Sequence, residues 1–279
     1  MAVFKVNFMA ETMGRTVPLM VILPTDKMYF PDITRSEEGK PFKTLYLLHG
    51  IIGNYTDWLY GTRIQRYAEE HDLAVVMPSG DNSMYIDHAV DKYGEFIGCE
   101  LVEFTRKTFP LSHRKEDTYI GGLSMGGFGA MRNGLKYSDT FGAIVALSSA
   151  FVVDESILVP VEDPKFPSDT MEYRHAVYGA DLEKAISSDI NPKWLVQEMA
   201  KQGKSFPDIY MACGTEDFLF ERNNEFHRLL EENGVKHKYV TGPGAHEWDF
   251  WDTYIKDALN WLPLEDVMQG RTSGNVGLE

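Results

Sequence analysis

A serine stands between two glycines in the run from Gly122 to Gly126, where an expected strand meets an expected helix. A chain can pass from strand to helix within one residue only with unusual backbone angles and close packing, which glycine permits because it lacks a Cβ atom. Such a turn is typical of a nucleophile elbow, which exposes the serine hydroxyl above the edge of a sheet. The sequence therefore predicts Ser124 as a nucleophile and the amide of Met125 as a donor to an oxyanion.

A carboxylate and then a histidine follow the serine, each just after an expected strand. We assign the acid to Asp217, with Glu216 as the alternative carboxylate, which would otherwise be a solvated loop residue. His246 lies on a loop rich in glycine and proline just before a helix. We predict that His246 takes and returns the proton of Ser124, while Asp217 fixes the tautomer of the imidazole.

The second oxyanion donor is expected on the loop after an early strand, because a nucleophile elbow is usually complemented by an amide from there. Residues 44–48 form a continuous apolar run, as in a strand buried on both faces. We assign the second donor to the amide of Ile51. His49 is then interpreted as a histidine that holds this loop, and Trp58 as either a wall of the pocket or an ordinary core aromatic.

Five short runs, spread over residues 45–250, carry a resemblance to a known family; they are residues 47–54, 75–79, 121–130, 213–217 and 244–246. The chain resembles the esterase D group of α/β-hydrolases, which includes S-formylglutathione hydrolases, tributyrin esterases and several feruloyl and acetyl-xylan esterases. Within that group it most resembles the bacterial tributyrin-esterase branch. The resemblance implies an α/β-hydrolase fold, a serine carboxylesterase activity without cofactor, and a triad at Ser124, Asp217 and His246.

The expected substrates are esters with a short acyl group or a small aromatic acyl group of the feruloyl or cinnamoyl type. S-formylglutathione hydrolases usually carry a Gly-x-Thr-Cys run where this chain has residues 51–54, which argues against a glutathione thioester. Aromatic side chains in the long segment before the acid, at Phe166, Tyr173 and Tyr178, are predicted to line the pocket with Trp58. The alternatives are a thioesterase, a peptidase or an acyltransferase on the same triad, and, in another class, an inactive binding protein.

The composition favours a small-molecule enzyme and opposes some other classes of partner. With 27 Lys and Arg against 42 Asp and Glu, the formal net charge is −15, which opposes binding to nucleic acid or to an anionic membrane. Two cysteines are too few for a disulfide framework, and no motif for a metal or a cofactor is present. The start of the chain lacks the pattern of a signal peptide, so we expect a cytoplasmic protein, unless an export signal was trimmed. The sequence is compatible with a monomer or a homo-oligomer.

Strands alternate with helices, which predicts an α/β fold: a mostly parallel sheet with helices on both faces and an antiparallel start. The expected strands are residues 3–9, 17–23, 44–49, 74–78, 117–121, 141–147, 206–214 and 236–241. The expected helices are residues 63–71, 94–108, 127–137, 219–233 and 248–262. We expect one domain at 1–264 with a cap or lid inserted at about 150–192, because such a length is unusual for a structureless loop. Residues 265–279 are expected to be a flexible tail.

Overall fold

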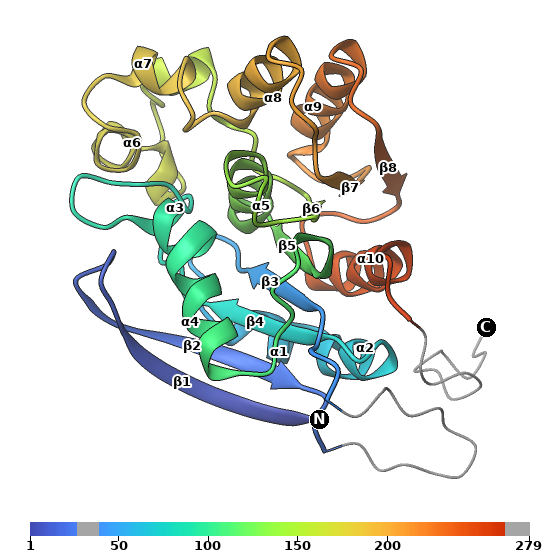
Figure 1. The fold of residues 1–279 in the computed structure, drawn as a ribbon. Coiled ribbons are helices and arrows are strands. Elements are labelled where there is room, and N and C mark those ends of the chain that lie inside the picture. Colours follow the sequence, from blue (N-terminus) through green and yellow to red (C-terminus); the bar gives the residue numbers. More distant parts are fainter. Residues whose placement is uncertain (27–38, 266–279) are drawn as a thin grey trace.

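A single mixed sheet organises the part of the chain that the computed structural model describes, residues 1–26 and 39–265. Its eight strands lie in the order β1-β2-β4-β3-β5-β6-β7-β8 (Figure 1). The strands from β3 to β8 are parallel, whereas β1 pairs antiparallel with β2 and β2 antiparallel with β4. The strands are β1 Ala2–Ala10, β2 Arg15–Leu23, β3 Thr44–Leu48, β4 Ala74–Pro78, β5 Thr118–Leu123, β6 Ala143–Leu147, β7 Asp208–Gly214 and β8 His237–Gly242. The predicted parallel sheet with an antiparallel start is confirmed.

Helices follow most of the strands, as the sequence predicts. They are α1 Asp57–Gly61, α2 Ile64–Glu70, α3 Tyr93–Glu95, α4 Leu101–Thr108, α5 Met125–Lys136, α6 Met171–Tyr178, α7 Leu182–Ile186, α8 Pro192–Lys201, α9 Phe220–Glu232 and α10 Trp248–Trp261. The helix expected at 94–108 is interrupted by a π-helical turn at Phe96–Glu100. The short helix α1 and the helices from α6 to α8 were not predicted.

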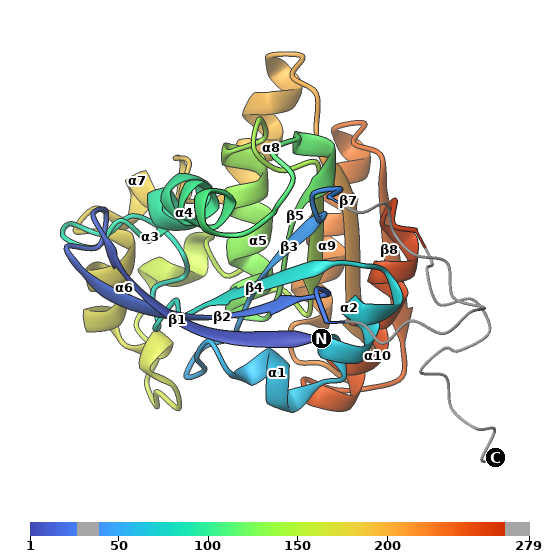
Figure 2. The same cartoon turned by 60° about the horizontal axis from the view of Figure 1, so that its bottom comes forward.

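The two faces of the sheet carry two separate hydrophobic layers, because successive side chains of a strand point to opposite faces. On β3, Tyr46 and Leu48 belong to one layer, while Leu45 and Leu47 belong to the other. Figure 2 shows α4, α5 and α8 on one face and α1, α2 and α10 on the other. The loops at the carboxyl ends of the parallel strands therefore gather at one edge, which is where this class of sheet places its binding sites.

The segment between β6 and β7 is folded, and its helices begin at recognisable caps. The Thr170 side chain accepts a hydrogen bond from the amide of Tyr173 at the start of α6, and Asp181 and Asn191 cap α7 and α8 in the same way. The Tyr173 hydroxyl donates to the carbonyl of Asn82 at 2.8 Å, which ties α6 to the loop after β4.

Within residues 1–26 and 39–265, no helix has both the length and the apolar character needed to cross a membrane. Apart from residue 265, the tail expected at 265–279 lies outside the described residues.

Helix α5 approaches the sheet so closely that two glycines near its start have no room for a side chain. A Cβ atom on Gly126 would lie 2.3 Å from the carbonyl oxygen of Leu48, and one on Gly122 would lie 2.4 Å from the carbonyl carbon of Gly126. The obstacles are backbone atoms of β3 and α5, which cannot rotate away as a side chain does. The contact between α5 and the sheet therefore depends on these glycines.

Replacing Gly126 by alanine is expected to lower the free energy of unfolding by about 1–3 kcal/mol, because β3 and α5 must move apart. Urea unfolding measures the loss. Gly121→Ala is the matched control, since its added Cβ would meet its nearest atom at 3.1 Å and needs only a small shift. A Gly126→Ala protein as stable as the wild type would show that α5 is not held at this distance.

Candidate active site

Ser124 is the single residue between β5 and α5, and its backbone is strained. Its φ and ψ are 54° and −117°, a conformation that side-chain-bearing residues rarely adopt. The Ser124 amide donates to the carbonyl of Leu147 at 2.9 Å, and its carbonyl accepts from the amide of Ala150 at 3.0 Å. These bonds to the end of β6 and the residues after it hold the turn in place. The sequence prediction of a sharp strand-to-helix turn at this serine is confirmed.

Asp217 and His246 are brought together by the loops after β7 and β8. The Nδ1 atom of His246 lies 2.9 Å from Oδ2 of Asp217, whose carboxylate is fully buried. The other oxygen of Asp217 accepts from the amide of Leu219 at 2.8 Å. A carboxylate can only accept, so Nδ1 carries the proton and Nε2 of the neutral ring has a free lone pair.

The charge of Asp217 is maintained despite its burial. Burial by itself raises the pKa of this carboxyl group, but the hydrogen bonds from His246 and from the amide of Leu219 outweigh it, and the pKa lies below its ordinary value. Asp217 is therefore ionised at neutral pH and can stabilise a positive charge on the imidazole.

Glu216, the alternative acid, binds the backbone of the loop that carries His246 and does not contact the imidazole ring. Its Oε2 accepts from the amide of Gly244 at 2.6 Å, and its own amide donates to the carbonyl of Gly244 at 3.1 Å. The hydrogen bond from Gly244 is the main reason that the pKa of Glu216 is lowered. Glu216 thus contacts the backbone two residues before His246, whereas Asp217 contacts the ring itself.

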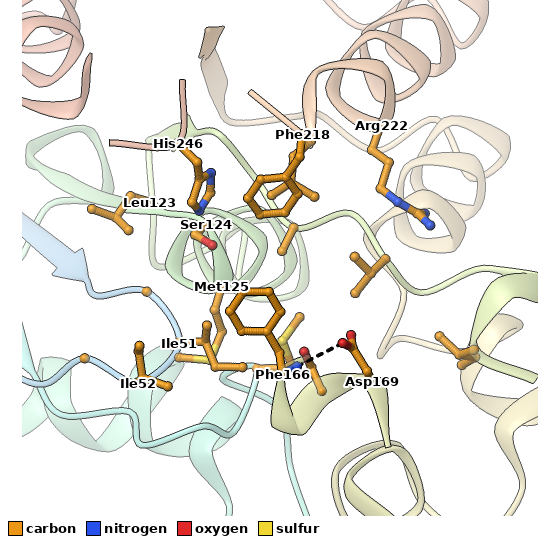
Figure 3. Close-up of a pocket in the computed structure, with 18 of the residues that line it drawn as sticks. Ile51, Ile52, Leu123, Ser124, Met125, Phe166, Asp169, Phe218, Arg222 and His246 are labelled. Carbon is orange, nitrogen blue, oxygen red and sulfur yellow. Dashed lines mark hydrogen bonds between the residues drawn. The ribbon is translucent and has the colours of Figure 1, made fainter. Parts of the chain in front are cut away.

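Two aromatic rings contact the imidazole of His246. Phe218 lies with its ring centroid 4.7 Å away and Trp251 at 4.9 Å, the latter edge to face. Trp251 is itself held by a hydrogen bond from its indole nitrogen to the hydroxyl of Ser148 at 3.1 Å. In Figure 3 the ring of His246 lies beside the side chain of Ser124, and both residues line the same cavity.

The amides predicted as oxyanion donors belong to residues that line this cavity. Met125 is the first residue of α5, and the first amides of a helix have no partner within it. Ile51 lies on the loop after β3, next to Met125 in Figure 3.

His49 holds the loop that carries Ile51. Its Nδ1 contacts the carbonyl oxygen of Gly50 at 2.6 Å, and its Nε2 accepts from the amide of Gly80 at 2.8 Å. Burial lowers the pKa of His49, so the ring is neutral and serves as a bridge between two loops. The interpretation of this histidine as a loop-holding residue is confirmed.

The cavity has a volume of about 650 Å³ and is bounded largely by apolar side chains. Of the four aromatic residues predicted for the pocket, Phe166 and Tyr178 line this cavity. Trp58 and Tyr173 are not among its described lining residues. Trp58 is buried and its indole nitrogen donates to the carbonyl of Leu48, which makes it a core aromatic. The Tyr173 hydroxyl is directed to the loop at Asn82 instead.

Several lining residues were not identified from the sequence, namely Phe218, Arg222, Trp248 and Trp251. Phe218 directly follows Asp217, and the two tryptophans lie in the first turn of the helix after the histidine loop. Their proximity in sequence to the proposed acid and base was a usable signal. Arg222 forms an ion pair with Asp154, which joins α9 to the segment between β6 and β7.

Among the described ranges, no group of three or more His, Cys, Asp or Glu side chains is arranged to hold a metal ion.

Comparison with known proteins gives consistent matches over almost the whole chain. A family model described as "Esterase: Putative esterase" matches residues 10–262. An acetyl esterase of Caldicellulosiruptor saccharolyticus is 41% identical over 266 residues, covering 94% of this chain and 98% of that protein. The substrate-bound structure of fluorophosphonate-binding serine hydrolase F from Staphylococcus aureus is 33% identical with a TM-score of 0.79, covering 94% of this chain and 98% of the other. S-formylglutathione hydrolase from S. aureus is also 33% identical, with a TM-score of 0.78 and the same coverage.

The lowered pKa of Asp217 predicts a pH-dependent contribution to stability. A carboxyl group whose pKa is lower in the folded than in the unfolded chain stabilises the fold above its unfolded pKa, about 3.9, and loses that contribution as the pH falls through the folded value. The free energy of unfolding of the wild type should therefore exceed that of Asp217→Asn by more at pH 7 than at pH 3. Urea unfolding of both proteins across this range measures the difference in the free energy of unfolding. A difference that did not change with pH would contradict a lowered pKa for Asp217.

Proposed function

The chain belongs to the esterase family and is a serine esterase with an α/β-hydrolase fold, and we propose that Ser124, His246 and Asp217 are its catalytic triad. The observation that carries the proposal is the 2.9 Å contact between a buried, ionised carboxylate and the histidine that faces the strained serine in one cavity. The hydroxyl, the imidazole and the carboxylate then follow one another in the order that ester hydrolysis by a serine nucleophile needs.

In the first half of the reaction, Ser124 Oγ attacks the carbonyl carbon of the ester and its proton passes to Nε2 of His246. The negative charge that develops on the carbonyl oxygen is stabilised by the amides of Ile51 and Met125. Asp217 stabilises the imidazolium through Nδ1. The intermediate then collapses, the bond to the alcohol oxygen breaks, and that oxygen takes the proton from Nε2.

In the second half, a water molecule attacks the acyl group on Ser124. His246 accepts a proton from the water through Nε2 and returns it to Ser124 Oγ as the acid leaves. The products are one carboxylic acid and one alcohol, and the side chains end in their starting protonation states. No cofactor enters the proposed reaction.

We propose that the acyl part of the substrate is short, from acetyl to butyryl, or a small aromatic group of the cinnamoyl type. The walls of the cavity include Leu123, Ala150 and Trp251, which suit a small apolar or planar group. The 41% identity to an acetyl esterase supports the short acyl group.

Hydrolysis of thioesters is the second candidate, supported by the 33% identity to an S-formylglutathione hydrolase. A comparison of kcat/KM for S-formylglutathione and p-nitrophenyl acetate distinguishes the two. A preference of more than a hundredfold for the thioester would favour the second candidate.

We also propose one domain at 1–264, with the segment at about 150–192 acting as a cap over the cavity. The supporting observation is that Val152, Ile157, Phe166 and Tyr178 from this segment line the cavity. A cytoplasmic location and a small-molecule ester as the partner are part of the same proposal. The formal net charge of −15 supports the choice of partner, because it opposes binding to nucleic acid or an anionic membrane. The oligomeric state, monomer or homo-oligomer, is to be measured by sedimentation.

The triad is tested by three variants of residues at the site. Ser124→Ala and Asp217→Asn should each lower kcat for p-nitrophenyl acetate by a factor on the order of 10⁴ or more, because one removes the nucleophile and the other the group that fixes the tautomer. Glu216→Gln is the matched control and should lose far less, since an amide oxygen can still accept from Gly244. Labelling by a fluorophosphonate probe should disappear in Ser124→Ala. A larger loss at Glu216 than at Asp217 would reverse the assignment of the acid.

The acyl preference is tested by p-nitrophenyl esters from acetate to palmitate, together with methyl ferulate. We expect kcat/KM to be highest between acetate and butyrate, in keeping with the 41% identity to an acetyl esterase. A site that buried a longer chain would instead gain about 0.8 kcal/mol for each additional methylene. A steady rise from butyrate to palmitate would identify a long-chain esterase and contradict the proposal.

A further inference from the structure

Exposed hydrophobic side chains gather at the mouth of the cavity. Ile52, Val161, Phe166 and Phe218 are exposed by 76%, 42%, 52% and 72%, and all four line the cavity. They come from three separate parts of the chain: the loop after β3, the segment between β6 and β7, and the loop after β7. Large apolar side chains left in water at one place are typical of a surface that binds an apolar partner or ligand.

Phe218 differs from the others because it contacts the proposed general base. Its ring centroid lies 4.7 Å from that of His246, and it directly follows Asp217 in the chain. In Figure 3, Phe218 lies on the His246 side of Ser124, whereas Phe166 lies on the other side, near Ile51 and Met125. The two rings therefore border different parts of the site.

The proposed chemistry determines which part of the ester meets Phe218. The alcohol oxygen has to receive a proton from Nε2 of His246, so it lies within hydrogen-bond reach of that nitrogen when its bond to the acyl carbon breaks. The acyl group stays on Ser124, with its oxygen toward the amides of Ile51 and Met125. The atoms attached to the alcohol oxygen consequently extend along the His246 side, where the exposed ring of Phe218 lies.

We propose that Phe218 is a specificity-determining residue for the alcohol part of the ester, and that the enzyme favours aromatic alcohols. A phenyl ring that is 72% exposed has apolar area to bury, and a flat ligand ring can stack on it or meet it edge to face. A small alcohol such as ethanol cannot cover this ring. The proposal rests on the proposed triad and adds the leaving-group class to it.

The test compares two acetate esters whose acyl group is the same. Phe218→Ala should lower kcat/KM for benzyl acetate by roughly tenfold while changing that for ethyl acetate less than about twofold, since only the benzyl group contacts the ring. The deacylation rate of the acetyl-enzyme, measured after a p-nitrophenyl acetate burst, should be unchanged, because the alcohol has already left. Phe218→Leu keeps apolar area without a ring and should fall between the wild type and Phe218→Ala.

Tyr60→Ala is the matched control, because Tyr60 is an aromatic residue exposed by 79% that does not line the cavity in the described chain. It should leave both esters unaffected. An equal loss for benzyl and ethyl acetate in Phe218→Ala, or a slower deacylation, would overturn the proposal by showing that Phe218 only positions His246. Unchanged hydrolysis of benzyl acetate would overturn it as well. The same esters with Ser124→Ala test the triad separately, since that variant should lose both activities.

Discussion

The close approach of α5 to the centre of the sheet is the constraint on which the site depends. Ser124 has a positive φ only because β5 ends and α5 begins on either side of it. The helix can lie there because Gly122 and Gly126 present no side chain to the backbone of β3 and α5. Hydrogen bonds to Leu147 and from Ala150 retain the strained turn. The same turn places the first amide of a helix next to the serine, so one local feature positions both the proposed nucleophile and a proposed donor to the oxyanion.

The remaining groups of the site are positioned by contacts between loops. Gly214 ends β7 so close to the histidine loop that a Cβ there would lie 2.0 Å from the carbonyl oxygen of Gly244. Glu216 then binds the same glycine through its side chain and its amide. His49 likewise bridges the loops after β3 and β4. The proposed acid and base thus depend on two loops held to each other, not on a single rigid element.

The parts of the fold with strong local signals could be predicted from the sequence. The continuous apolar run at residues 74–78 became β4 with the same bounds, since a strand buried on both faces needs no periodic pattern to be recognised. The helices between β6 and β7 were missed, although Thr170, Asp181 and Asn191 are favourable N-cap residues and Pro192 is well placed in a first turn. Each helix is short, and its apolar face becomes evident only against the rest of the protein. The π-helical turn at Phe96–Glu100 has no comparable signal in the sequence.

The sequence by itself determined the residue types and their order: a serine between glycines, an acid after one strand, and a histidine after the next. Parallel strands present their carboxyl ends at one edge, so order along the chain was enough to predict that these residues approach one another. Only the tertiary structure decided between Glu216 and Asp217 as partner of the imidazole, because adjacent residues on a loop point in different directions. It also decided that Phe166 and Tyr178 line the cavity while Trp58 and Tyr173 do not. An aromatic side chain is equally suited to a core and to a cavity wall, and the difference lies in which distant segments surround it.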